Sequence, residues 1–103
     1  MDTFTTLAEP NRRVILDALR ERPCTVGMLV EILGTSQPTV SKHLRVLREA
    51  GLVVVRPEGQ RRWYEIDPAP LDQLDRWLEP YRRLWSERLD ELGRHLERGR
   101  RKP

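Results

Sequence analysis

One eleven-residue stretch constrains the fold more than any other, because it predicts a helix with one buried side and one side suited to a polyanion. The stretch covers residues 36–46. At 100° per residue, Val40 and Leu44 share one stripe, whereas Lys42 and Arg45 point away from it. Such a helix can lie in a DNA groove, with small hydroxyl side chains at its start allowing close approach. An ordinary amphipathic surface helix is the alternative.

The residues before this stretch predict a second, shorter helix at about 25–33. Its apolar side chains recur at helical spacing, and Gly34 follows where a helix end favours a residue tolerant of positive φ. Ser36 is a suitable N-cap for the next helix, Pro38 fits its first turn, and Gly51 fits its end. Helix, glycine turn and helix form a helix-turn-helix over about residues 25–50, whose second helix enters the major groove.

The residues after the second helix predict a β-hairpin. Residues 52–56 form a β-branched apolar run, residues 57–60 a turn, and residues 61–66 a returning strand. This hairpin is a wing beside the helix-turn-helix, and it carries Arg56, Arg61 and Arg62, which can straddle a DNA backbone. We expect Trp63 or Tyr64 to anchor it on the core. A charged hairpin edge that only discourages aggregation is the alternative.

Positive charge is concentrated in the predicted reading elements. Residues 36–64 contain six Lys or Arg and two acidic residues, a net charge of +4, whereas the whole chain carries +3. The remainder of the chain is therefore slightly acidic. A localised positive excess is typical of a nucleic-acid surface.

The C-terminal third predicts a long amphipathic helix over about residues 70–98. Its apolar residues recur at three- and four-residue intervals: Leu71, Leu74, Leu78, Tyr81, Trp85, Leu89, Leu92 and Leu96. A small winged helix cannot cover so long a stripe, so we expect it to pack against a second copy, joined by the segment around Phe4 and Leu7. Pro80 should kink or break the helix, because it lacks an N–H and crowds the preceding turn.

These elements predict one domain, mainly α with a β-hairpin (α+β), a winged helix-turn-helix over residues 1–98 followed by a basic tail at 99–103. The chain has no apolar run of membrane-spanning length and no signal-peptide pattern at its start, so we expect a cytoplasmic protein. Phosphate loops, nucleophile elbows and paired catalytic carboxylates are not recognisable either. We therefore expect no enzyme and no cofactor.

Four segments of the chain resemble the ArsR family of bacterial winged-helix transcriptional repressors. They are Leu-Ala-Glu-Pro-Asn-Arg-Arg-Val-Ile-Leu at 7–16, Ser-Gln-Pro-Thr-Val-Ser-Lys-His-Leu at 36–44, Leu-Arg-Glu-Ala-Gly-Leu-Val at 47–53 and Arg-Arg-Trp-Tyr at 61–64. Their order and spacing match over about residues 4–78. The resemblance implies a homodimer that binds operator DNA and is released by an inducer, whose identity it does not give.

The chain departs from the metal-sensing members of that family. Their Cys-Val-Cys-Asp-Leu box would place its cysteines at Thr25 and Gly27, which cannot serve as thiolate ligands. Cys24 is a single thiol, and His95 stands alone where the second known site needs several ligands. We therefore expect no metal site. Cys24 is interpreted as a small buried hydrophobic residue, with a redox switch as the alternative.

We expect double-stranded DNA to be contacted by residues of the second helix and the wing: Ser36, Gln37, Pro38, Thr39, Ser41, Lys42, His43, Arg45, Arg61 and Arg62. The expected dimer interface consists of Phe4, Leu7, Leu78, Tyr81, Trp85, Leu89 and Leu92. Arg12 and Arg13 are weaker candidates for backbone contact. Two alternatives stay open. One is a ligand- or redox-responsive sensor with Trp77, Tyr81 and Trp85 around a pocket between subunits, and the other is a protein-interaction module without DNA binding.

Overall fold

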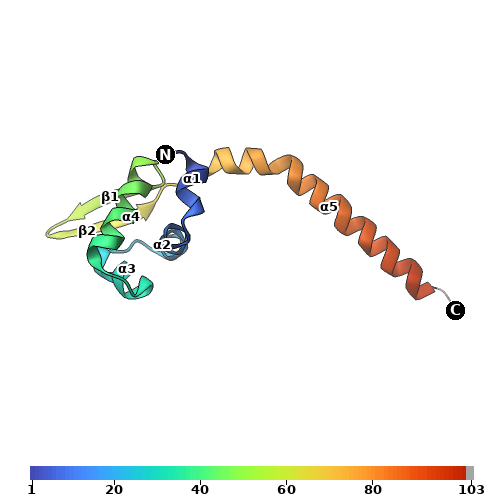
Figure 1. The fold of residues 1–103 in the computed structure, drawn as a ribbon, viewed down its shortest axis with the longest axis horizontal. Coiled ribbons are helices and arrows are strands. Elements are labelled where there is room, and N and C mark those ends of the chain that lie inside the picture. The colour runs from blue at the N-terminus through green and yellow to red at the C-terminus, as the bar shows by residue number, and fades with distance from the viewer. Residues whose placement is uncertain (102–103) are drawn as a thin grey trace. The chain divides into compact units, whose positions relative to one another are not determined.

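The computed structural model describes the backbone of residues 1–101 and the side chains of residues 1–99. Helices dominate, with one β-hairpin between the fourth and fifth helix (Figure 1). In chain order the elements are α1 (Thr3–Ala8), α2 (Pro10–Glu21), α3 (Val26–Leu33), α4 (Gln37–Glu49), β1 (Val53–Glu58), β2 (Arg61–Ile66) and α5 (Leu71–Arg101). The predicted fold class, mainly helical with a hairpin and a long last helix, is confirmed.

The chain divides into two compact units. The first covers Met1–Gln73 and contains α1 to α4, the hairpin and the first residues of α5. The second begins at Leu74 and consists of the remainder of α5. The helix-turn-helix and the wing both belong to the first unit.

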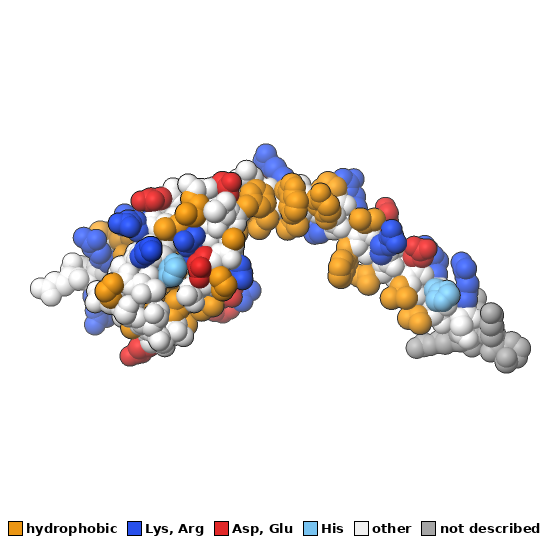
Figure 2. Space-filling view, in the orientation of Figure 1, with side chains coloured by type: hydrophobic (Ala, Val, Ile, Leu, Met, Phe, Trp, Pro, Cys, Tyr) orange, Lys and Arg blue, Asp and Glu red, His pale blue; other side chains and the backbone are white. Residues whose placement is uncertain are grey.

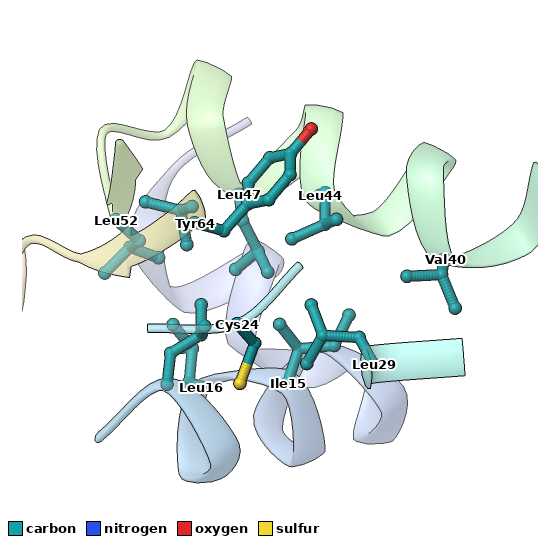
Figure 3. Packing of buried hydrophobic residues seen from close by; sticks show 11 residues of the cluster. Ile15, Leu16, Cys24, Leu29, Val40, Leu44, Leu47, Leu52 and Tyr64 are labelled. Atoms are coloured by element: carbon teal, nitrogen blue, oxygen red, sulfur yellow. The ribbon is translucent and has the colours of Figure 1, made fainter. Parts of the chain in front are cut away.

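The first unit is built around one hydrophobic core. Helix α4 contributes one face to it, and in Figure 3 Val40, Leu44 and Leu47 point from α4 toward Ile15 and Leu29 of the opposite helices. Its buried members are Ile15, Leu16, Leu19, Cys24, Leu29, Val40, Leu44, Leu47, Leu52, Val53 and Tyr64. Because α4 buries its apolar side here, its other side is left for contacts outside the domain.

The ends of α3 and α4 are set by local chemistry. Thr25 caps α3, its hydroxyl accepting a hydrogen bond from the Met28 N–H at 3.3 Å. Gly34 ends α3 in the left-handed region at φ 66°, and Gly51 follows α4 at φ 76°. Both glycines lie where the sequence predicted them, because an L side chain would be strained at these dihedral angles.

The hairpin is antiparallel and its turn is tighter than expected. Residues 57 and 58 extend β1, so that only Gly59 and Gln60 form the turn. Gly59 has φ 60° and Gln60 does not have a positive φ, which fits a type II′ turn. Pro57 lies opposite Arg62 in the register. The predicted four-residue turn at 57–60 was therefore too long.

Backbone pairing with Cys24 explains why Pro57 fits into β1. The N–H of Tyr64 donates to the Cys24 carbonyl at 2.8 Å, and the N–H of Cys24 donates to the Tyr64 carbonyl at 3.1 Å. Tyr64 therefore directs its backbone groups away from β1, and so does Arg62 two residues before it. Pro57, opposite Arg62, then needs no N–H for pairing. The Cys24 bridge also fixes the base of the hairpin to the core.

Helix α5 runs without a break from Leu71 to Arg101, with Pro80 inside it. Of the two outcomes expected at Pro80, a kink or a break, the continuous helix excludes the break. Arg82 bridges this part of the helix: its guanidinium donates to the Asp75 carbonyl at 3.1 Å and to the Glu79 carboxylate at 2.8 Å. These bonds hold the turns on either side of the proline together, where the proline itself cannot donate.

The helix also continues beyond the predicted boundary at residue 98. Residues 99–101 of the expected basic tail are helical, and Lys102 and Pro103 lie outside the described residues. Within the described part of the chain, none of the helices combines the length and apolar character that crossing a membrane would need.

Candidate nucleic-acid interface

One side of α4 is exposed and basic. Opposite the buried stripe, a shallow surface pocket is lined by Pro38, Ser41, Lys42 and Arg45. Gln37 is also exposed at the first position of the helix. In Figure 2, Lys and Arg side chains gather over the end of the first unit that carries α4 and the hairpin. Five of the residues expected to contact DNA thus share an accessible surface.

Two further expected DNA contacts are occupied in capping α4. The Ser36 hydroxyl accepts a hydrogen bond from the Thr39 N–H at 3.4 Å and lies 2.9 Å from the Thr39 hydroxyl. The first of these bonds confirms Ser36 as the predicted N-cap. The two hydroxyls fix the start of α4, so they orient the residues beside them as well as facing solvent themselves.

His43 differs from its neighbours in being half-buried. Its Nδ1 atom is enclosed and, among the described residues, has no hydrogen-bond partner. The imidazole ring therefore lies at the border between the buried stripe and the exposed side of α4. This placement is closer to packing than to the accessible position expected of a phosphate contact.

The arginines of the wing fall into two groups. Arg56 forms ion pairs with the carboxylates of Glu65 and Glu58, each at 3.1 Å. The hydrogen bond to Glu65 contributes most to raising the pKa of Arg56, and the hydrogen bond to Glu58 follows. Arg61 and Arg62 are exposed and have no ion pair among the described residues. Of the wing arginines, Arg61 and Arg62 are therefore available to bind an external anion, whereas Arg56 is not.

Tyr64 and Cys24 connect the wing to the core. Tyr64 is buried, which confirms that one aromatic residue anchors the hairpin. Cys24 is only 1% exposed, and its burial raises the pKa of the thiol. Trp63 is half-buried, with an enclosed Nε1 that has no hydrogen-bond partner among the described residues.

The side chains of Arg12 and Arg13 are engaged in hydrogen bonds to backbone carbonyls, although Arg13 is exposed. The Arg13 guanidinium donates to the carbonyls of Leu7 at 2.6 Å and Ala8 at 3.2 Å. The Arg12 guanidinium donates to the Thr6 carbonyl at 3.3 Å. Both side chains satisfy carbonyl groups at the end of α1, a role that the sequence analysis missed because it treated them only as surface charges.

No metal site is assembled by the described residues: no three His, Cys, Asp or Glu side chains lie close enough together to hold an ion. At the position of the metal-sensing box, Thr25 is used as the cap of α3 and Gly27 lies in its first turn. His95 lies on α5, among the side chains Arg88, Glu91, Leu92, Arg94 and Arg98.

Most of the expected interface residues of α5 are exposed. Figure 2 shows hydrophobic side chains gathered along one side of this helix and Lys and Arg side chains along the other. Tyr81 is 53% exposed and its ring centroid lies 4.8 Å from that of Trp77. The remaining members range from the half-buried Leu78 to Leu89, Leu92 and the 70% exposed Trp85. In the first unit, Phe4 is 36% exposed, whereas Leu7 packs against the core.

Comparison with known proteins assigns the family. The family model described as "Bacterial regulatory protein, arsR family" matches residues 9–55. The HTH-type transcriptional regulator Rv2034 of Mycobacterium tuberculosis is 43% identical over 86 residues, 84% of this chain and 78% of that protein. The transcriptional repressor SdpR of Bacillus subtilis is 30% identical over 75% of this chain and 86% of its own length.

A solved structure agrees with both relatives. The crystal structure of a possible transcriptional regulator for arsenical resistance is 37% identical, covers 92% of this chain and 96% of its own, and has a TM-score of 0.72. Sequence and fold thus agree over most of the chain, including the helix-turn-helix and the wing. The chain therefore belongs to the ArsR family of bacterial regulatory proteins, a family of DNA-binding transcription regulators and not of enzymes.

Proposed function

We propose that this regulator represses transcription as a homodimer that occupies a pseudo-palindromic operator. Helix α4 of each subunit enters the major groove, and Gln37, Ser41 and Arg45 meet base edges there. Lys42 and the wing residues Arg61 and Arg62 contact phosphates. The observation that carries this proposal is the exposed basic side of α4 next to two wing arginines that no carboxylate neutralises among the described residues.

The dimer is proposed from the second unit. A DNA reader with one short helix gains specificity when two copies are held at a fixed separation, about one helical turn or roughly 34–36 Å. The apolar stripe of α5 supports this arrangement, because side chains such as Trp85 and Leu89 are more than half exposed in one chain. A two-fold contact between identical stripes removes them from water.

The test is selection of bound duplexes from a random pool, followed by affinity measurements at several salt concentrations. We expect an enriched sequence with two half-sites. With three phosphate contacts per subunit, log K should fall with log salt at a slope of about −5. Sedimentation of the complex should give two chains per duplex. No enriched sequence, together with no binding to mixed DNA at low salt, would favour a protein-interaction module instead.

A further inference from the structure

The exposed side of α4 that carries Gln37, Ser41, Lys42 and Arg45 is called the reading surface below. A second basic groove lies beside it, between the end of α4 and the wing. Its walls include Arg48 from the last turn of α4, Val55 and Pro57 from β1, and Arg61 and Arg62 from β2. Arg48 was not among the residues expected to contact DNA. The groove brings its guanidinium group into one surface with the two wing arginines.

The groove has an uncompensated positive charge. No acidic side chain of the described residues lines it. The carboxylates of the wing, Glu58 and Glu65, are held by Arg56. Among the described residues, none of the three arginines of the groove forms an ion pair. A groove lined by guanidinium groups without a counter-charge favours a bound anion, and the planar guanidinium fork matches the oxygens of a phosphate.

The hairpin register explains why Arg62 belongs to this groove. Arg62 lies opposite Pro57, and Tyr64 lies opposite Val55, so these four side chains share one face of the hairpin. Tyr64 occupies the part of that face that is buried in the core. Arg62 occupies the part beyond the core, on the side where Arg48 is found. Arg56, opposite Trp63, belongs to the other face.

The helix geometry relates Arg48 to the reading residues. Arg48 follows Gln37 by eleven residues and Ser41 by seven, spacings that return to nearly the same side of an α-helix. At 1.5 Å per residue, Arg48 lies about 16 Å along α4 from Gln37. The major groove is roughly 12 Å wide. When the first turns of α4 lie inside the groove, the last turn therefore reaches the phosphates that border it.

We propose that Arg48 and Arg62 together bind one phosphate of the DNA backbone, at the edge of the major groove that α4 enters. This inference rests on the proposed function and adds a positioning contact to it. The shared phosphate fixes α4 and the wing relative to the same strand, so it sets the register in which Gln37 and Ser41 meet the bases.

A structural role of Arg48 must be separated from this one. Arg48 lies in the last turn of α4, where a positive charge also stabilises the helix dipole. The variants are therefore Arg48→Gln and Arg48→Lys. Arg20→Gln serves as the control, because it removes an exposed arginine of α2, away from the reading surface, that pairs only with its neighbour Glu21 among the described residues. Thermal unfolding of each variant measures the structural contribution.

The experiment uses the selected operator with single phosphates replaced by neutral methylphosphonates, one position at a time. For the wild type we expect one position bordering each half-site to lower affinity about tenfold. Arg48→Gln should lower affinity for the unmodified operator by a similar factor and reduce the salt slope by about 1 per subunit. It should then lose less than the wild type does at that one methylphosphonate, because only Arg62 still contacts this phosphate, and Arg62→Gln should behave in the same way through Arg48.

Several results would overturn the inference. If Arg48→Gln bound the operator with the affinity and the salt slope of the wild type, Arg48 would not contact a phosphate, and the proposed function would still stand. Equal losses of operator affinity in Arg48→Gln and Arg20→Gln would show that the effect comes from the net charge of the protein and not from a contact of Arg48. Release of the operator by millimolar inorganic phosphate at constant ionic strength, through Arg48, would assign the groove to a free anion. Failure of the wild type to select any operator would overturn both proposals.

Discussion

Substitutions of Ser36 can separate effects on folding from effects on DNA binding, because Ser36 caps α4 and also lies at the start of the reading surface. Its hydroxyl accepts the Thr39 N–H at 3.4 Å, longer than an ordinary N–H···O bond. Loss of this cap in Ser36→Ala should therefore cost the lower part of the usual range, about 0.5–1 kcal/mol. In a unit of this size that corresponds to a fall in Tm of about 2–8 °C.

Ser36→Asp should have the opposite pattern. An aspartate caps a helix well, and its charge is favourable near a helix N-terminus, so the Tm should equal or exceed that of the wild type. Beside DNA, however, the carboxylate meets a phosphate. At a separation of about 6 Å and an effective dielectric constant of about 40, the repulsion is roughly 1.4 kcal/mol, about tenfold in affinity per subunit.

The assays are thermal unfolding at fixed protein concentration and fluorescence anisotropy with the selected operator at two salt concentrations. Ser86→Asp is the matched control, since it makes the same change on an exposed position of α5 outside the apolar stripe. It should leave operator affinity within about twofold of wild type, because it adds the same charge outside the unit that carries the helix-turn-helix and the wing. A Ser36→Asp variant as stable as wild type that binds DNA equally well would refute the placement of Ser36 beside the backbone.

Three further outcomes are expected. Replacing both Trp85 and Leu89 by Glu should give monomers by sedimentation that keep their helical circular dichroism but no longer bind the operator; a variant that stays dimeric would place the interface elsewhere. Arg45→Ala should change the preferred base at one position, at a cost of about 1–3 kcal/mol, whereas Arg61→Ala should weaken all sequences alike; equal losses across a base panel for both would contradict this division. Burial raises the pKa of the Cys24 thiol in the folded protein, so this thiol ionises at a lower pH in the unfolded chain, and wild type should lose stability relative to Cys24→Ser as the pH rises above about 8.5. Both proteins should repress equally at neutral pH. A metal ion that releases DNA from wild type but not from Cys24→Ser would contradict this equal repression.

The helix-turn-helix and the wing were predictable because their signals are local. Hydrophobic periodicity fixed the buried stripe of α4, and Gly34, Ser36 and Gly51 marked the ends of helices. The sequence also predicted that Trp63 or Tyr64 would anchor the wing, and the structure identifies Tyr64 as the buried one. Each of these features depends on residues no more than a few positions apart, so sequence spacing alone was sufficient.

The misjudged features depend on side-chain partners that spacing does not reveal. Arg56 looked as available as its neighbours until the hairpin brought Glu65 beside it. Pro80 was expected to kink or break α5, and neither the unbroken helix nor the bond of Arg82 to the preceding turn could be read from spacing. Arg48 was counted only as charge, because its place beside the wing follows from the packing of β1 on α4.

The attachment of the hairpin at Tyr64 has a consequence for how this regulator can vary. The Tyr64 amide, bonded to the Cys24 carbonyl at 2.8 Å and buried in the core, should exchange its hydrogen slowly, while the amides of the exposed tip at Gly59 and Gln60 should exchange orders of magnitude faster. Beyond this fixed point, lengthening the tip by a few residues costs only the small entropy of a larger loop. The reach of the wing along a DNA strand can therefore be tuned by insertion at its tip without disturbing the core that holds α4.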